Sequence, residues 1–413
     1  MNMSYHSNIP KYYACKFFRT LSFWLPIMTL YPLSKGLNLA QVASLVVIQS
    51  LAQLIFEIPS GAIADFFGRK NTLIIAGVFR AVYMAVILFG FGYGAFLIGW
   101  MFYGIAEAFE SGSDAAFVYD TLKECGREND YQKVEGRGFS FTILGWGAGA
   151  FFGGFIIPHS YDLAVLLNIV AVLISCIINF TFKEPKRESK TASKNYISHM
   201  KIATSFVFKH KQLLWLTLLL GGMTGAMQLS HLFFQPYMLE AGLDIKYFGL
   251  IYVFFLGTTS LVSAYSHRVE RFLGSKLSIV IIPTLLGLSL VVNGLLVNFI
   301  GIAFIFLNQL VFGFTRPFIL NVINKLVTSE KRATVISMSG FLNGVIALFG
   351  PIFGYFGDLY SIEIALLLEG IVVLIMGTFF AIMILNNYER PRTNGTGKRR
   401  ATSPSTSSGS HDD

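Results

Sequence analysis

Long apolar runs alternate with short polar segments along almost the whole chain. The hydrocarbon core of a bilayer is about 30 Å thick, and a helix needs roughly 20 predominantly apolar residues to cross it. Gly and Pro occur inside several runs, and both are tolerated in membrane helices. The pattern therefore predicts twelve membrane-spanning helices. Their approximate limits are 17–33, 40–62, 73–92, 95–118, 138–157, 163–182, 213–238, 248–265, 277–297, 299–322, 334–356 and 363–385.

Lysine and arginine are unevenly distributed among the predicted loops. Both termini, and the loops on their side of the membrane, carry almost all of the 32 Lys and Arg residues. The opposite loops carry only Lys35 and Lys246. Because loops rich in Lys and Arg remain in the cytoplasm, we expect both termini there and the protein in the inner membrane. Topology thus explains the net charge of +9, and we expect no nucleic-acid partner.

A basic polar segment divides the predicted helices into two groups of six. We therefore expect an all-α membrane protein with a six-helix N-terminal half at 1–183, a cytoplasmic linker at 184–212 and a six-helix C-terminal half at 213–385. Residues 386–413 are rich in Arg, Pro, Ser, Thr and Gly. Such a segment has too little apolar surface to fold, so we expect a disordered cytoplasmic tail.

Composition supports a lipid environment. The chain is 54% hydrophobic and only 13% charged, whereas soluble domains contain about 25% charged residues. The three cysteines, Cys15, Cys125 and Cys176, are widely separated. This spacing excludes a disulfide framework and forms no metal-ligand cluster, so we expect neither a metal nor a cofactor.

A charged motif lies at the end of the second predicted span: Gly61-Ala-Ile-Ala-Asp65-Phe-Phe-Gly68-Arg69-Lys70. Gly68 permits a tight turn, Asp65 can face a helix N-terminus or a cation, and the two basic residues suit an anionic leaflet surface. The motif resembles the signature loop between helices two and three of the major facilitator superfamily. This resemblance covers the chain to the end of the last span, and it implies two six-helix halves around a cavity and a gating role for the loop.

The fifth predicted span carries four closely spaced glycines, Gly145, Gly149, Gly153 and Gly154, which we call the glycine ladder. It resembles the ladder of drug:proton antiporters of the same superfamily, with Ala150 at the position of their proline. Close glycines let neighbouring helices approach and slide. Two interpretations remain open, an export-specific ladder and ordinary tight packing.

Three acids lie within the fourth predicted span. Glu107, Glu110 and Asp114 are spaced i, i+3, i+7, which places them on one helix face. Ionisable residues in a membrane helix are costly and mark a transport pathway by default. Repulsion and burial favour protonation of at least one acid, which suits a proton carrier. Alternatively, the three acids pair with cations and hold helices together.

Other polar residues concentrate in the first, seventh and tenth spans, which the resemblance places around the central cavity. They are Arg19, Gln228, His231, Gln235, Asn308 and Arg316. Arg19 and Asp114 are expected at similar depth, where they can form an ion pair. His231 is either a titrating relay or a hydrogen-bonded helix contact, and Arg316 meets either an acid or an anionic substrate group.

Two further charged positions are interpreted differently. Glu57 and Arg80 lie on adjacent spans at similar distances from the charged motif, so we expect a structural ion pair. Glu369, in the outer part of the twelfth span, has no evident partner.

These features favour a proton-coupled transporter that exports a small organic compound, cationic or amphipathic, by alternating access. The expected partners are the substrate, protons and the lipid bilayer, and we expect a monomer. The alternatives are a proton-coupled importer of a metabolite and a transporter-like sensor without flux. The chain has no phosphate-binding Gly-rich loop and no nucleophile–base constellation, so we expect neither an ATP-driven pump nor an enzyme.

Overall fold

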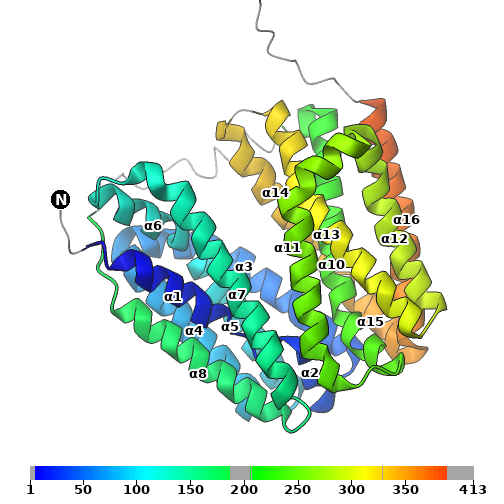
Figure 1. The fold of residues 1–413 in the computed structure, drawn as a ribbon, viewed down its shortest axis with the longest axis horizontal. Coiled ribbons are helices and arrows are strands. Elements are labelled where there is room, and N and C mark those ends of the chain that lie inside the picture. The colour runs from blue at the N-terminus through cyan, green and yellow to red at the C-terminus, as the bar shows by residue number, and fades with distance from the viewer. Residues whose placement is uncertain (1–4, 187–204, 206, 328, 388–413) are drawn as a thin grey trace, which may run out of the picture.

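The structure, a computed structural model, describes residues 5–186, 205, 207–327 and 329–387, and within them every regular element is helical. Figure 1 shows two helical bundles side by side, one built by the first half of the chain and one by the second. The predicted all-α fold with two halves is confirmed. Most of the predicted linker, and the predicted tail from residue 388, lie outside the described residues.

The N-terminal bundle contains the elements before the linker. They are α1 (Asn8–Thr20), η2 (Leu25–Ile27), α2 (Leu30–Ser34), α3 (Leu39–Phe67), α4 (Arg69–Phe89), α5 (Gly92–Glu110), α6 (Ser113–Glu124), η3 (Glu128–Asp130), α7 (Tyr131–Ile156) and α8 (Tyr161–Phe180).

The C-terminal bundle contains the elements after it. They are α10 (Lys211–Glu240), η4 (Ile245–Tyr247), α11 (Phe248–Leu273), α12 (Ser275–Leu295), α13 (Phe299–Leu326), α14 (Ser329–Ala347), α15 (Gly350–Leu359) and α16 (Ile362–Asn386).

Within the described ranges, ten helices are long and apolar enough to cross a membrane. The predicted first and fourth spans are not continuous helices. The first is divided into α1, η2 and α2, and the short η2 has a proline in its first turn. The fourth is interrupted after α5 at Gly112, whose φ of 73° is readily adopted only by glycine. Both breaks lie on elements that carry predicted site residues.

The long helices of both bundles carry faces of exposed apolar side chains. Ile55, Phe89, Ile177 and Ile375 are each more than 60% exposed. Large apolar side chains on long helices require an apolar surrounding, so these faces suit contact with lipid. Among the ten candidate spans of the described residues, α10 is the most enclosed, with 72% of its most apolar window buried, and it packs against α13, α14 and α16.

The two bundles contact each other mainly through α3 with α15 and α7 with α11. A Cβ on Gly354 of α15 would lie 2.7 Å from the Cα of Ala40 in α3, and one on Gly249 of α11 would lie 2.7 Å from the Cα of Gly154 in α7. Glycine at these positions therefore allows the backbones to touch. All four residues lie near the loops that carry Lys35 and Lys246, at the end of the molecule where the basic loops are absent.

Polar contacts reinforce this end. The carboxylate of Asp358 in α15 accepts hydrogen bonds from the backbone N–H groups of Leu39 (2.8 Å) and Ala40 (2.9 Å), at the N-terminus of α3. The side chain of Gln235 in α10 donates to the carbonyl of Leu25 and accepts from the N–H of Thr29. Because a helix N-terminus carries partial positive charge, the contact with Asp358 is electrostatically favourable.

Candidate functional site

A row of alternating charges crosses the interior of the N-terminal bundle. Its members come from α1, α4, α5 and α6, and each acid contacts at least one base. We call this row the charge chain. In order along the row, it consists of Lys16, Asp114, Arg19, Glu110, Arg80 and Glu107.

The first part of the charge chain joins α1 to α5 and α6. Lys16 Nζ forms an ion pair with Asp114 Oδ2. The same Asp114 oxygen lies 3.4 Å from Arg19 Nη2, and that nitrogen lies 2.9 Å from Glu110 Oε1. Arg19 therefore bridges two acids, and the expected proximity of Arg19 and Asp114 is present. Asp114 lies in the first turn of α6, where the helix dipole also favours a negative charge.

The second part joins α4 to α5. Arg80 Nη2 lies 2.8 Å from Glu110 Oε2 and also pairs with Glu107 Oε1. The ring of Tyr103 lies 5.2 Å from the Arg80 guanidinium carbon, a cation–π distance. Glu107 is thus the last acid of the row, and it contacts a single base that it shares with Glu110.

The charge chain is electrically balanced, with three acids and three bases. Its inner side chains are only 11–17% exposed, whereas the Glu107 side chain is 32% exposed. Charged groups at this depth are stable only when paired. Among the three acids of the row, Glu107 therefore contacts the fewest bases and has the most exposed side chain.

The predicted ion pair between Glu57 and Arg80 was wrong. Arg80 points to the acids of α5, while the Glu57 side chain is exposed on α3. The acids of α5 offer Arg80 two carboxylates on successive turns, which a single acid on α3 cannot match. Similar distances of Glu57 and Arg80 from the charged motif do not fix the partner of Arg80, because α5 also packs against α4 and presents its acids there.

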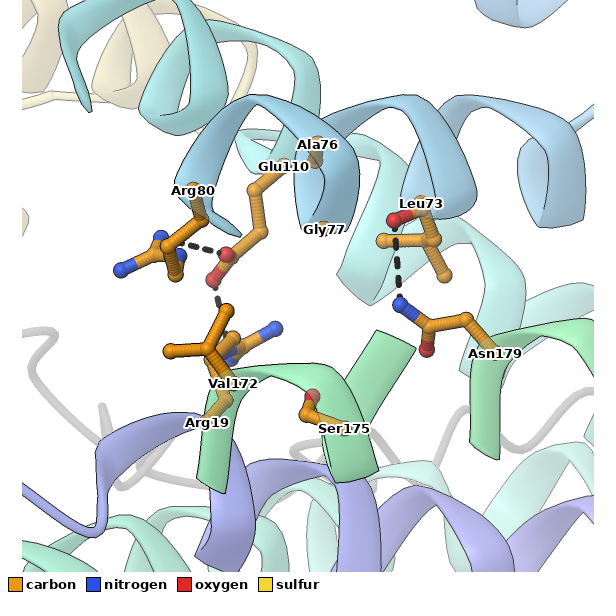
Figure 2. Close-up of a pocket in the computed structure, with 9 residues that line it drawn as sticks. All are labelled: Arg19, Leu73, Ala76, Gly77, Arg80, Glu110, Val172, Ser175 and Asn179. Atoms are coloured by element: carbon orange, nitrogen blue, oxygen red, sulfur yellow. Dashed lines mark hydrogen bonds and ion pairs between the residues drawn. The ribbon is translucent and has the colours of Figure 1, made fainter. Parts of the chain in front are cut away.

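A small pocket adjoins the charge chain between α1, α4, α5 and α8. Figure 2 shows Glu110 between Arg19 and Arg80, with Ser175 and Asn179 of α8 on the other wall. The cavity volume open to a water-sized sphere is about 10 Å³, which is about the space that one water molecule needs and far too small for an organic substrate. We therefore assign the substrate elsewhere.

The predicted polar residues of the C-terminal bundle do not form one cluster. His231 Nε2 lies 2.9 Å from Gln309 Nε2, and the imidazole packs between the rings of Phe234 and Phe312. Gln309 also contacts Thr259 of α11 at 3.2 Å. Gln309 was not among the predicted site residues, because its neighbour Asn308 had been selected on α13.

The other predicted residues of this bundle have different environments. Gln235 is engaged between the bundles, as described above, and Gln228 is half-buried. Asn308 is fully buried, and its amide nitrogen and oxygen form no hydrogen bond among the described residues. Arg316 is exposed.

The predicted gating loop folds against its own bundle. Gly68, with a φ of 109°, lies between α3 and α4. Asp65 Oδ1 lies 3.2 Å from Arg69 Nη2. The carboxylate of Glu184, just after α8, accepts from the backbone N–H groups of Arg69 and Lys70, both at 2.8 Å. Glu184 was missed because it lies in the predicted linker. It fixes the loop to the end of α8. Gly61 lies in α3 with open space beside its backbone.

The glycine ladder packs α7 against the broken first span. A Cβ on Gly145 would lie 2.3 Å from Thr20 Oγ1, one on Gly149 would lie 2.3 Å from the Ser22 nitrogen, and one on Gly153 would lie 2.1 Å from the Phe23 oxygen. The fourth member, Gly154, faces α11 across the bundles. The ladder therefore allows three close contacts, with the last residue of α1 and with the segment that follows it.

Among the described residues, no group of three or more His, Cys, Asp or Glu side chains is placed to hold a metal ion. The three cysteines are buried and free.

Comparison with known proteins identifies the family. The sequence profile of the Major Facilitator Superfamily matches residues 12–297. An uncharacterised MFS-type transporter of Bacillus subtilis (strain 168), YxaM, is 24% identical over 237 residues, which cover 56% of this chain and 58% of the relative. Multidrug resistance protein 2 of the same organism is 27% identical over 186 residues, covering 43% and 45%. The chain thus spans about half the length of these relatives.

Solved structures share the fold. The nucleoside transporter NupG superposes with a TM-score of 0.76 at 13% identity, covering 93% of this chain and 99% of NupG. A D-xylose–proton symporter superposes with a TM-score of 0.68 at 12% identity, covering 94% and 98%.

Proposed function

Because this chain belongs to the major facilitator superfamily, we propose that it is a proton-coupled secondary transporter that exports a small organic compound. Members of this family are multi-pass membrane transporters and not enzymes. Proton coupling, export and the class of substrate are our proposal.

The charge chain is the observation that carries proton coupling. Glu107 is the most exposed acid of the row, and among the described residues its ion-pair partner is Arg80 alone. When Glu107 takes up a proton, Arg80 keeps one carboxylate instead of two, so its position between α4 and α5 changes. A proton on this acid therefore alters the contacts of two helices of the N-terminal bundle.

The place where the bundles meet supports transport by alternating access. They contact each other at the end with few basic residues, through the glycine contacts and through Asp358. The uneven distribution of Lys and Arg supports placing that end outside the cytoplasm, with both termini inside and the protein in the inner membrane. In this conformation the outer end is closed, and transport requires the bundles to rock about a site between them.

Export is supported by the similarity to a multidrug resistance protein. The balance of acids and bases in the charge chain favours an amphipathic substrate over a strongly cationic one, because no net negative charge remains to attract a cation. Import of a metabolite is the second candidate. Its support is the fold shared with nucleoside and sugar transporters.

The test uses purified protein in proteoliposomes with an imposed pH gradient and ethidium as the probe. We expect gradient-driven ethidium flux in the unmodified protein. Glu107→Gln should lose driven flux and keep ethidium exchange without a gradient. Glu57→Gln, an exposed acid outside the charge chain, is the matched control and should behave as the unmodified protein. Driven flux that survives Glu107→Gln would remove Glu107 from coupling, and no flux of any probe would favour the sensor hypothesis.

A further inference from the structure

A second buried acid lies in the other bundle, far along the sequence from the charge chain. Glu369 of α16 is 1% exposed. Its Oε1 lies 2.9 Å from the hydroxyl oxygen of Ser230 in α10. Its Oε2 is buried and has no hydrogen-bond partner among the described atoms. No ion pair of Glu369 occurs in the described part of the chain.

Counting hydrogen atoms at Ser230 decides between the two forms of the carboxyl. The Ser230 Oγ lies 2.9 Å from the Ala226 carbonyl oxygen and 2.9 Å from Glu369 Oε1. A hydroxyl carries one proton, and a carbonyl oxygen can only accept. If Ser230 donates to Ala226, the contact with Glu369 is satisfied only when the carboxyl donates its own proton.

The ionised form of the Glu369 carboxyl would have too few hydrogen-bond donors around it. A carboxylate can accept about four hydrogen bonds, and Ser230 could supply one at most. Burying an unpaired charge in an apolar interior is strongly unfavourable, so such groups become neutral instead. The protonated form satisfies Oε1, Ser230 and Ala226 together, and it leaves no uncompensated charge in the bundle.

No neighbouring charge compensates Glu369. The helices packed against α16 are α10, α12 and α15. The titratable side chains of these helices are Lys211, His231, Tyr237, Glu240, Lys276, Tyr355, Asp358 and, on α16 itself, Glu363. His231 bonds to Gln309, Tyr237 to a backbone carbonyl and Asp358 to the N-terminus of α3. Within the described residues, none of the eight contacts the Glu369 carboxyl.

We propose that Glu369 and Ser230 form a proton-binding site of the C-terminal bundle, loaded in this conformation. The site is coupled to movement of the bundles through α10. Gln235 lies five residues after Ser230, about 7.5 Å along the helix axis, and bonds to Leu25 and Thr29 of the other bundle. Separation of the outer ends breaks these bonds and moves α10 relative to α16, which opens the site and releases the proton.

Infrared spectroscopy of the purified full-length protein tests the protonation directly. We expect a carbonyl stretching band of a protonated carboxylic acid at neutral pH that Glu369→Gln removes. Glu240→Gln, an exposed acid at the end of α10, is the control and should leave the band unchanged. Ser230→Ala keeps the carboxyl and should shift the band, because the hydrogen bond is lost. Ser230→Ala therefore tests the proposal even if Glu369→Gln does not fold. Identical spectra for the unmodified protein and Glu369→Gln, or no shift in Ser230→Ala, would overturn the proposal.

The coupling step rests on the proton-coupled transport proposed above, and flux measurements test it separately. Glu369→Gln should retain ethidium exchange without a gradient and lose the response to the pH gradient. Unchanged driven flux would overturn the coupling role. If the unmodified protein moves no ethidium, the proposed function fails, while the infrared bands still decide whether Glu369 holds a proton.

Discussion

Arg19 joins the two parts of the charge chain. It is 11% exposed and contacts Glu110 at 2.9 Å and Asp114 at 3.4 Å. Each acid has one other base, Arg80 for Glu110 and Lys16 for Asp114. Removing Arg19 therefore leaves three acids with two bases in a low-dielectric interior, which strongly penalises the ionised row.

We predict that Arg19→Ala destabilises the protein by about 3–5 kcal/mol, the usual range for breaking a buried ion pair from one side. The measurement is the thermal unfolding midpoint of the purified protein in detergent. Arg271→Ala, at the exposed end of α11, should change the midpoint little. Adding Glu110→Gln to Arg19→Ala should recover part of the loss, because it removes one unpaired acid. A double variant less stable than Arg19→Ala would contradict this assignment.

At the scale of single residues, the sequence identified the buried charged residues, but it did not identify all of their ion-pair partners. The i, i+3, i+7 spacing of Glu107, Glu110 and Asp114 identified the acids, since spacing is a local property. The partner of Arg80 depends on how α4 packs against α5, which is a tertiary property, so Glu57 was the wrong choice. Glu184 was invisible for a similar reason, because capping of α4 by a distant carboxylate leaves no local pattern.

At the scale of helices, the glycine ladder positions the broken first span. Without side chains at Gly145, Gly149 and Gly153, α7 approaches the backbone that follows α1, and this fixes the end of the helix that carries Lys16 and Arg19. The ladder was predicted from sequence, but its partner was not. The predicted spans likewise could not reveal the break at Gly112, because a glycine is tolerated inside a membrane helix with or without a break.

Two alanine substitutions in α7 separate packing from helix propensity. We expect Gly149→Ala to destabilise the protein by about 1–3 kcal/mol, as overpacking does, because its Cβ would lie 2.3 Å from a backbone nitrogen. Gly147→Ala has nothing within 4 Å of the new Cβ and should be neutral or slightly stabilising, because alanine favours a helix over glycine. Unfolding midpoints in detergent compare the two. Equal midpoints would show that the approach of α7 to the first span is not required.

At the scale of the whole molecule, the two bundles are joined by contacts that can be broken without unfolding either one. Asp358 at the N-terminus of α3 and the paired glycines of α7 and α11 all lie at one end. The division into two halves was predictable, because the polar linker interrupts the apolar pattern. The end at which the two bundles contact each other was not predictable, because the apolar pattern of the sequence is the same in every conformation of a rocking transporter.

A disulfide between the bundles tests whether they must separate. A Cβ built on Gly344 of α14 lies 3.8 Å from the Cβ of Ser50 in α3, which is the mean separation in disulfides. The double variant Ser50→Cys, Gly344→Cys should therefore form a disulfide under oxidation, without strain in either bundle. Gly340, one turn earlier, has nothing within 4 Å of a built Cβ. Ser50→Cys, Gly340→Cys should thus remain reduced and serves as the control.

Because this bond joins α3 to α14 across the two bundles, it holds them in the present conformation. We expect the oxidised double variant to bind ethidium and to move none of it across proteoliposome membranes, with flux restored by a reducing agent. The bond prevents any rocking motion that separates α3 from α14 at these two positions. If the crosslinked protein transports at the rate of its reduced form, the substrate passes by a route that leaves α3 and α14 in contact, and alternating access by rocking of the two bundles is wrong for this protein.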